Sequence, residues 1–493
     1  MDRKCDCVRL TVPQKLAFLP IITRIANEMA RMLGFSPEEA LEIELGVEEA
    51  ATNAVKHAYD PDETGMEVIF QPADLGIEII VKDRGIPFDP KSVPSYHLCK
   101  KNMESTGLGI HLMKHIFDHV SFLNLGKDGK ETRLVKYAGS RHINEYGAQE
   151  MPPAQADPGP AGPPAIREIR RMRPGEAVAV SRCAYRAYRY SYIYEHIYHP
   201  ERVRKLNSNG KLISYVVVSD AGEVVGHAAL IPQVDKKDIC EMGVAFVMPE
   251  CRGGGMLNRL TQVLLREIRT HGFQGAYVHA VTSHPFSQRA AHREGFGDTC
   301  LLLSCVAPLD FKKITEESRP HRESLIHSFL YCRKPASPTI YPPARHEEIV
   351  RLIYRNLGME PQIRGDSGKA KSRGKGVVRV HTDNNSSSHI HVLQFAGNTR
   401  EEVRSILRQL CLRRVETIFL YINLCDPCAS GAGEFEDMGF FFSGVFPGMG
   451  TDETLVLQYH NNTVVDYGLF QMNSEMGKRL LDYIKARDPN QNL

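Results

Sequence analysis

Residues 44–59 read ELGVEEAATNAVKHAY, and this stretch decides how the first part of the chain is interpreted. The pattern predicts one helix that carries an acid at Glu49 and an amide at Asn53. A spacing of four residues places both side chains on one helix face, one turn apart. Three alanines lie beside them and are small enough to let a ligand or another backbone approach. Taken alone, such a pair is more often a solvated helix surface than a site.

Size and composition set the broad class of protein. A chain of 493 residues predicts about three or four domains. The hydrophobic fraction of 42% and the net charge of +2 are ordinary for a globular protein and favour neither nucleic acid nor an anionic membrane surface. The start of the chain has no apolar signal core, and no apolar run approaches the ~20 residues of a spanning helix. We therefore expect a cytoplasmic protein that contacts neither nucleic acid nor a membrane directly.

The elements around the opening stretch predict an α/β domain. A helix is expected over 14–32. Ser36 can cap the next helix, with Pro37 at its first position and Glu39 completing a capping box. That helix is expected to continue to about Tyr59. Strands are expected over 65–71, 76–82, 120–125 and 131–137, and a short helix over 110–117.

Two glycine motifs follow the opening stretch. Asp83-Arg-Gly85 stands at the end of a predicted strand, and Gly107-Leu-Gly109 stands directly before a predicted helix. Each motif is weak by itself, but their order behind Glu49 and Asn53 is specific. The combination resembles the GHKL ATPases, and within them the short anti-sigma-factor serine kinases. The resemblance covers about residues 10–138.

The resemblance implies that this region binds ATP and Mg²⁺. Asn53 would be a metal ligand, since an amide oxygen is a hard ligand suited to Mg²⁺ between phosphates. Asp83 would accept a hydrogen bond from the exocyclic amine of adenine. Gly85 would leave room for the base.

The remaining implied roles concern phosphate and proton transfer. Backbone N–H groups at Gly107, Leu108 and Gly109 would approach phosphate at a helix N-terminus. Glu49 would act as general base towards a protein hydroxyl or water. Of the family's closing-strand motif, only Thr132 is retained.

The same resemblance suggests partners. A transferred phosphate would go to a Ser or Thr of a small protein such as an anti-sigma-factor antagonist. A sigma factor is a further candidate partner, and the domain is a candidate homodimer interface. No phospho-accepting histidine helix precedes the domain in the sequence, which disfavours a sensor histidine kinase.

A proline-rich stretch marks the clearest boundary. Residues 151–164 hold six prolines and two glycines, which is typical of a semi-rigid linker. The chain is therefore divided into an ATP-binding domain over 1–140, a linker over 141–164, a second α/β domain over 165–310 and a third over 311–493.

The second domain carries its own glycine motif. Val247-Met-Pro-Glu-Cys-Arg252-Gly-Gly-Gly255 lies between a predicted strand over 239–247 and a predicted helix over 256–270. This resembles the pyrophosphate loop of the GNAT acyltransferases, whose pattern is Arg/Gln-x-x-Gly-x-Gly/Ala. Arg252 and Gly255 match that pattern, whereas Leu257 stands where Gly or Ala is expected.

The resemblance implies acetyl-CoA as cofactor. Val247 and Arg252 would flank the loop. Backbone N–H groups of Gly253, Gly254, Gly255 and Met256 would hold the coenzyme's diphosphate.

Catalysis in this domain is less readable. Glu241 is a candidate base for an amine acceptor, or equally a strand-end carboxylate with no role. Ala291 stands where the family often has a tyrosine that protonates the departing thiolate. His284 and His292 are more typical of surface or core histidines. The acyl acceptor is not readable.

The third domain repeats part of the second. Strands expected over 416–424 and 453–459, with Gly439-Phe440 between them, follow the order of 275–281, Gly295-Phe296 and 299–306. A helix expected over 400–412 is not opened by a glycine-rich turn. We interpret the domain as a degenerate GNAT-like unit.

These expectations combine into a multidomain α/β (α+β) protein. A GHKL α/β sandwich precedes a GNAT-type mixed sheet flanked by helices and partly repeated. Two functional hypotheses remain. One is a regulatory enzyme with a Ser/Thr kinase-like ATP-binding domain and an acyl-CoA-dependent N-acetyltransferase domain. The alternative is a non-catalytic protein that binds partners in response to nucleotide and acyl-CoA.

Overall fold

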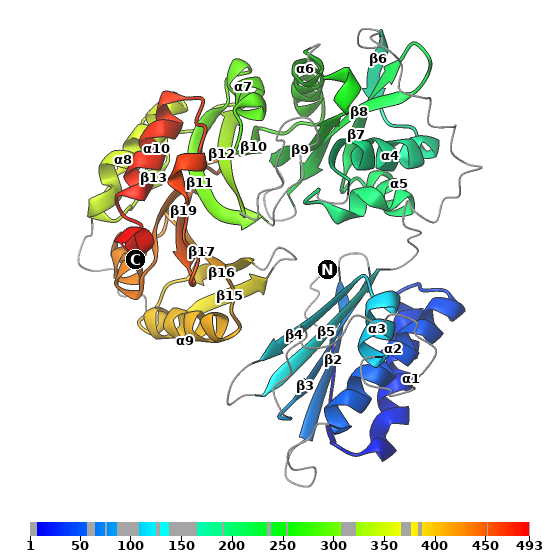
Figure 1. The fold of residues 1–493 in the computed structure, drawn as a ribbon. Coiled ribbons are helices and arrows are strands. Elements are labelled where there is room, and N and C mark those ends of the chain that lie inside the picture. The colour runs from blue at the N-terminus through cyan, green and yellow to red at the C-terminus, as the bar shows by residue number, and fades with distance from the viewer. Residues whose placement is uncertain are drawn as a thin grey trace. The chain divides into compact units, whose positions relative to one another are not determined.

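The protein forms two compact units, described here from a computed structural model (Figure 1). The first unit is Met1–Ser140 and the second is Arg141–Leu493. The linker expected at 141–164 lies outside the described residues. Those residues are 7–56, 65–73, 76–85, 108–124, 129–137, 165–189, 192–233, 238–252, 255–306, 322–365, 376–382, 387–450 and 452–492.

The first unit is a five-stranded antiparallel sheet with helices over one face (Figure 1). The strand order is β1-β2-β3-β5-β4, from β1 (Val8–Pro13), β2 (Gly65–Ala73), β3 (Gly76–Asp83), β4 (His119–Asn124) and β5 (Lys130–Tyr137). The helices are α1 (Leu19–Met32), α2 (Pro37–Lys56) and α3 (Leu108–Ile116). Their apolar sides and alternate residues of the strands form one core, which includes Ile22, Ile43, Val81 and Leu134.

The start of α2 confirms the predicted capping box. The Ser36 hydroxyl accepts from the Glu39 N–H at 3.1 Å, and the Glu39 carboxylate accepts from the Ser36 N–H at 2.8 Å. The start of the preceding helix was predicted wrongly. α1 begins at Leu19 after a short 3₁₀ turn, not at Gln14, because Pro20 fits only the first turn of a helix. The expected end of α2 near Tyr59 lies outside the described residues.

The second unit is built on one twelve-stranded mixed sheet. Seven strands form its first part, in the order β11-β12-β10-β9-β8-β7-β6. Their bounds are β6 (Ile166–Arg171), β7 (Ile213–Ser219), β8 (Val224–Pro232), β9 (Ile239–Val247), β10 (Gly275–Val281), β11 (Gly297–Val306) and β12 (Glu323–Tyr331). The helices of this part are α4 (Ala177–Tyr188), α5 (Pro200–Ser208), α6 (Met256–Thr270) and α7 (Phe286–Arg293).

The second part of the sheet repeats the first in mirror order. Its strands run β15-β16-β17-β19-β18, and β18 pairs with β11 to join the two parts. They are β15 (Val377–Thr382), β16 (Ser387–Gln394), β17 (Thr417–Asn423), β18 (Phe441–Phe446) and β19 (Thr454–His460). The helices are α8 (Glu347–Asn356), α9 (Thr399–Leu412) and α10 (Glu475–Lys485). A separate parallel pair, β13 (Thr339–Ile340) and β14 (Gln362–Ile363), completes this part.

Pairing directions confirm the repeat. β9 and β10 are parallel, as are β16 and β17. β10 then pairs antiparallel with β12, as β17 does with β19, and β11 with β12 as β18 does with β19. The predicted multidomain α/β architecture with a partly repeated GNAT-type sheet is therefore confirmed. None of the helices in the described ranges combines the length and apolar character needed to cross a membrane.

His227 and His460 are two of the deeply buried histidines of the second unit. His227 on β8 is 0% exposed and His460 on β19 is 3% exposed. Burial lowers the pKa of each imidazole from 6.5 to about 4, because the charged form loses its hydration. Asp488 opposes this shift at His460, and the Val244 carbonyl opposes it at His227. Both rings are therefore neutral at pH 7.

We predict that the second unit loses stability as the pH falls from about 6.5 to about 4. In this range these histidines are protonated in the unfolded chain but stay neutral in the folded protein. The free energy of unfolding therefore decreases as the pH falls. Each unit of pKa depression corresponds to about 1.4 kcal/mol per histidine. Urea unfolding of the full chain, followed by far-UV circular dichroism at several pH values, measures the slope. The double variant His227→Gln/His460→Gln should flatten it, and an unchanged slope would contradict the prediction.

Candidate functional sites

Helices α2 and α3 bring three of the predicted residues of the first unit together. Gly109, in the first turn of α3, lies against the half-buried Glu49 and Asn53 of α2. A Cβ added at Gly109 would overlap the Glu49 Oε2 atom and would lie 3.7 Å from the Asn53 Nδ2 atom. The absence of a side chain at position 109 thus lets the α3 backbone approach an acid and an amide.

A second glycine sets the distance between these helices. Gly46 lies one turn before Glu49, and a Cβ there would overlap the ring of Phe117, directly after α3. Phe117 is 3% exposed and belongs to the core of the first unit. The close packing at Gly46 therefore holds α3 where its first turn reaches Glu49.

The end of β3 carries a second group of the predicted residues of the first unit. Asp83 is 3% exposed; its Oδ1 accepts from the Gly85 N–H at 2.7 Å and lies 3.5 Å from the Lys130 ammonium. Thr132 pairs with Val81, so Asp83, Thr132 and Lys130 all lie on the helix-covered face of the sheet. Sequence reasoning missed Lys130, although a lysine opening the neighbouring strand was a visible signal.

Some predicted residues are not described fully. Gly107 lies outside the described residues, and only the backbone of Leu108 is described, as the first residue of α3. Within the described ranges no three His, Cys, Asp or Glu side chains converge as a metal site. A Mg²⁺ ion at Asn53 would thus take most of its ligands from phosphates and water, which is usual for this ion.

In the second unit, β9 and β10 part after a short parallel contact. They pair only from Ile239–Gly275 to Glu241–Tyr277. Beyond that point β9 contains a bulge, marked by a shift of its register against β8 and by φ of +50° at Val244. Positive φ is a genuine outlier for a β-branched residue. The bulge turns β9 away from β10 and opens the sheet between them.

His227 holds this bulge. Its Nδ1 atom lies 2.7 Å from the Val244 carbonyl oxygen, so Nδ1 carries the proton and donates. The ring also stacks on Phe246, with centroids 5.0 Å apart and planes at 20°. Sequence reasoning missed His227, because a single histidine in an apolar strand gives no sign of the carbonyl that it contacts.

The predicted glycine loop leads from β9 into α6. A 3₁₀ turn over Pro249–Cys251 is followed by Arg252, and Gly255 precedes α6 in the left-handed conformation with φ of +67°. The space around a Cβ at Gly255 is open. Gly253 and Gly254 lie outside the described residues. The N-terminus of α6 thus follows an open, glycine-rich turn, an arrangement suited to an anion.

Val247 and Met256 flank this loop from the core. They are 8% and 5% exposed, so their side chains pack inside, and only their backbone groups can face a ligand. Arg252 contributes a 3.5 Å contact from Nη2 to the Ala187 carbonyl of α4.

Glu241 lies at the point where β9 and β10 part. It is 7% exposed. The Tyr194 hydroxyl donates to its Oε1 at 2.8 Å, the Tyr277 hydroxyl donates to its Oε2 at 3.4 Å, and His279 Nδ1 lies 3.8 Å from Oε1. Burial, and then the charge of Glu241, raises the pKa of both tyrosines well above 10. Both hydroxyls therefore remain donors at neutral pH.

The repeated part of the sheet lacks such an opening. β16 and β17 pair continuously over six residues, from Ser387–Thr417 to Val392–Ile422. By register, His389 occupies the position of Glu241, and Phe419 that of Tyr277. α9 begins at Thr399 after Asn398, with no glycine turn in the left-handed conformation. The repeated part therefore has a histidine in place of Glu241, a continuous strand pair in place of the opening between β9 and β10, and no left-handed glycine before its helix.

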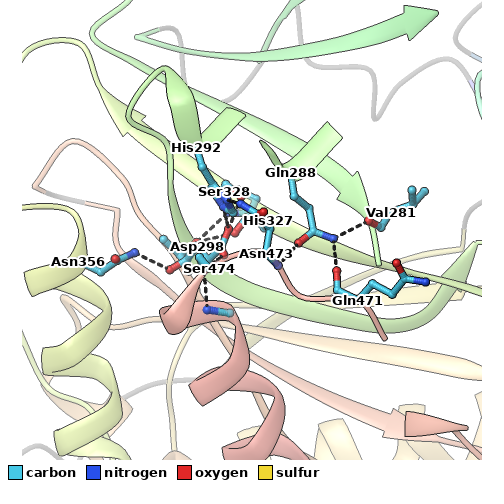
Figure 2. Close-up of polar contacts among 12 residues, drawn as sticks. Val281, Gln288, His292, Asp298, His327, Ser328, Asn356, Gln471, Asn473 and Ser474 are labelled. Atoms are coloured by element: carbon cyan, nitrogen blue, oxygen red, sulfur yellow. Dashed lines mark hydrogen bonds and ion pairs between the residues drawn. The ribbon is translucent and has the colours of Figure 1, made fainter. Parts of the chain in front are cut away.

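His292 has a structural role. Its Nε2 lies 2.8 Å from Asp298 Oδ1, and its Nδ1 lies 2.7 Å from Asn473 Nδ2 (Figure 2). The buried Asp298 also accepts from Ser328 at 2.5 Å and from Ser474. This polar cluster fastens the segment before α10 to α7 and β11.

Comparison with known proteins identifies two domains. Residues 12–136 match the family model described as the histidine kinase-like ATPase domain, and residues 180–296 match the acetyltransferase (GNAT) family. The serine-protein kinase RsbW of Bacillus thuringiensis (strain Al Hakam) is 24% identical over 153 residues, which are 30% of this chain and 94% of the relative. RsbW of Bacillus cereus (strain 03BB102) matches equally.

Solved structures resemble about a third of the chain. The spermidine N-acetyltransferase of Vibrio cholerae, in complex with CoA and spermine, shares 15% identity at a TM-score of 0.26 and covers 33% of this chain and 94% of its own. A GNAT phosphinothricin acetyltransferase from Sinorhizobium meliloti, in complex with AcCoA, shares 16% identity at a TM-score of 0.28 and covers 33% and 87%. Likeness at this level carries no functional argument.

The family matches and the sheet topology together define the class of protein. The chain carries a histidine kinase-like ATPase domain of the RsbW type and a GNAT acetyltransferase domain. A second, GNAT-like set of strands follows in the same sheet.

We predict that Gly109→Ala destabilises the first unit by about 1–3 kcal/mol, because the added methyl group overlaps the Glu49 carboxylate. The double variant Glu49→Ala/Gly109→Ala should recover most of that loss, since it removes the overlapping atoms. Urea unfolding of the four proteins of this cycle measures the coupling. Strict additivity of the two substitutions would show that the two residues are not in contact.

Proposed function

We propose that this protein is a transferase with two activities: ATP-dependent phosphorylation of a partner protein, and acetyl transfer from acetyl-CoA to an amine. The convergence of Glu49, Asn53 and Gly109 supports the first activity. The parting of β9 and β10 beside Glu241, with an open glycine turn before α6, supports the second.

For the kinase activity, Asn53 would bind the Mg²⁺ ion of MgATP, and the backbone at Gly107, Leu108 and Gly109 would face phosphate. Asp83, Gly85 and Thr132 would form the part of the ATP site that contacts the adenine base. The natural acceptor would be a Ser or Thr hydroxyl of an anti-sigma-factor antagonist, with a sigma factor as second partner, because the curated relatives are RsbW proteins. Glu49 would take the hydroxyl proton as the oxygen attacks the γ-phosphorus and ADP leaves.

For the transferase activity, the N-terminus of α6 and the loop at Arg252 and Gly255 would hold the diphosphate of acetyl-CoA. Glu241 would take one proton from the acceptor's ammonium group. The amine nitrogen would then bond to the acetyl carbon as the carbon–sulfur bond breaks. A second nitrogen proton would end on sulfur. The sum is ammonium plus acetyl-CoA giving acetamide, coenzyme A and one proton.

The second candidate function is a protein that binds nucleotide and acyl-CoA without turnover and responds through a partner. It is favoured by one observation, namely that Ala291 replaces the tyrosine that would protonate the thiolate. The two candidates differ in whether Glu49 and Glu241 affect rates or only stability.

We predict that Glu49→Gln binds MgATP within about twofold of the wild type but forms ADP about 10²–10⁴-fold more slowly, as expected for loss of a general base. Calorimetry with MgATP and an ADP-release assay, with water as acceptor, measure both quantities.

Asn53→Ala should weaken ATP binding at least tenfold in the presence of Mg²⁺ and less without it.

Glu48→Gln is the matched control, because Glu48 is the adjacent, exposed acid of the same helix. Equal ADP release by the Glu48 and Glu49 variants would contradict the kinase proposal and favour the binding-only alternative.

A further inference from the structure

We infer that Glu241 and the rings around it form the site for the acceptor's ammonium group, and that the second, GNAT-like part of the sheet completes this site. The acceptor class is then a monoamine carried on an apolar or aromatic body. This inference rests on the proposed acetyltransferase function and assigns its acceptor.

Glu241 is a buried acid without a Lys or Arg partner among the described residues. Glu241 is 7% exposed; the Tyr194 and Tyr277 hydroxyls donate to its carboxylate, and His279 Nδ1 lies 3.8 Å from Oε1. No Lys or Arg side chain of the described ranges forms an ion pair with it. A buried carboxylate without a counter-ion is costly, and a cation supplied by a ligand would remove that cost.

Aromatic and imidazole rings surround the Glu241 carboxylate. We define the ring cluster as Tyr194, Tyr277, His279, His327 and Phe446. Tyr277 and His327 stack with centroids 5.0 Å apart, and His327 and Phe446 stack at 4.3 Å. His279 meets Tyr277 and His327 edge-on, both at 5.2 Å. Aromatic faces near a carboxylate bind ammonium groups by cation–π attraction.

The ring cluster is built from both parts of the sheet. Phe446 ends β18, so it belongs to the repeated part of the sheet, whereas Glu241 and Tyr277 belong to β9 and β10. Phe446 also contacts Tyr421 of β17 at 5.8 Å, and Tyr421 stacks on His391 of β16 at 4.5 Å. A row of rings therefore continues from the carboxylate into the repeated part.

Among the described residues, Glu241 is the carboxylate whose contacts with these rings are defined. His389 stands where a second acid would be by register, and its Nδ1 lies 2.9 Å from the Tyr421 hydroxyl. A polyamine, which needs several anionic partners, fits this row poorly. A single ammonium group followed by an apolar or aromatic body matches both its charge and its rings.

The test uses the full chain saturated with coenzyme A. Calorimetry compares 2-phenylethylamine with 2-phenylethanol, which lacks the charge, and with spermidine, which carries several charges. We expect the monoamine to bind at least tenfold more tightly than either. Turnover of the same compounds with acetyl-CoA should rank them in the same order.

Variants locate the effect. Glu241→Gln should weaken 2-phenylethylamine binding at least tenfold and leave acetyl-CoA affinity within twofold. Phe446→Ala should weaken amine binding roughly 2- to 30-fold, and Phe446→Tyr, which keeps the aromatic face, should restore it. Glu223→Gln, at an exposed acid of the β7–β8 turn, is the control for a lost negative charge. Circular dichroism checks the fold of each variant.

The outcomes separate the two proposals. Absence of acetyl-CoA binding by the wild type would overturn the transferase proposal itself. Acetyl-CoA binding with a preference for spermidine or for the alcohol would overturn only the inferred acceptor class. Unchanged amine binding in Glu241→Gln would overturn the assignment of the ammonium site.

Discussion

The second unit depends on the contact of two strands, β11 and β18, at a single glycine. Cys300 pairs with Gly444, whose φ is +149°, and a Cβ at Gly444 would overlap the backbone of Thr299 and Cys300. Only glycine allows the two strands to lie this close. Without this contact the sheet would end at two separate edges, each with unpaired backbone groups.

Several features follow from that junction. One core crosses it, so Leu301 of β11 and Leu457 of β19 belong to the same set of buried side chains. The Asp298 cluster of Figure 2 ties the segment at Ser474 to β11 by buried polar contacts. The boundary that the sequence suggested near residue 310 lies between β11 and β12, which both belong to the first part of the sheet, and the two repeats form one compact unit. The ring of Phe446 reaches the rings near Glu241 for the same reason.

One physical difference between the two repeats is whether their parallel strand pair opens. In the first repeat, the bulge at Val244, held by His227, separates β9 from β10 after three paired residues. In the second, six consecutive pairs join β16 to β17, and the register shift of β16 against β15 comes only after the last of these pairs, between Val392 and Gln394. Backbone groups that pair with each other are not available to a ligand. The second repeat thus contributes side chains next to the Glu241 site and stabilises the sheet, but it does not form a second opening for a ligand.

Sequence reasoning found what local chemistry determines. It predicted the capping box at Ser36, and it placed Gly109 and Gly255 in motifs at the starts of helices. The contact of Gly109 with Glu49 and the left-handed conformation of Gly255 are found only in the structure. It missed features that depend on residues far apart in the chain. The edge strand β1 needs its partner β2, and Lys130 needs the neighbouring strand that brings it to Asp83. No pattern within β16 or β17 reveals that the two strands stay paired.

We propose that the chain keeps one open acyl-CoA site, in the first of its two related repeats. Isothermal titration of the full chain with acetyl-CoA tests it most directly. We expect a stoichiometry of one acetyl-CoA per wild-type chain. The Val244→Gly/His227→Ala variant should lose this single site, and no second site should then be detected. Two sites per wild-type chain, or one site that survives the loss of the β9 bulge contact, would contradict it.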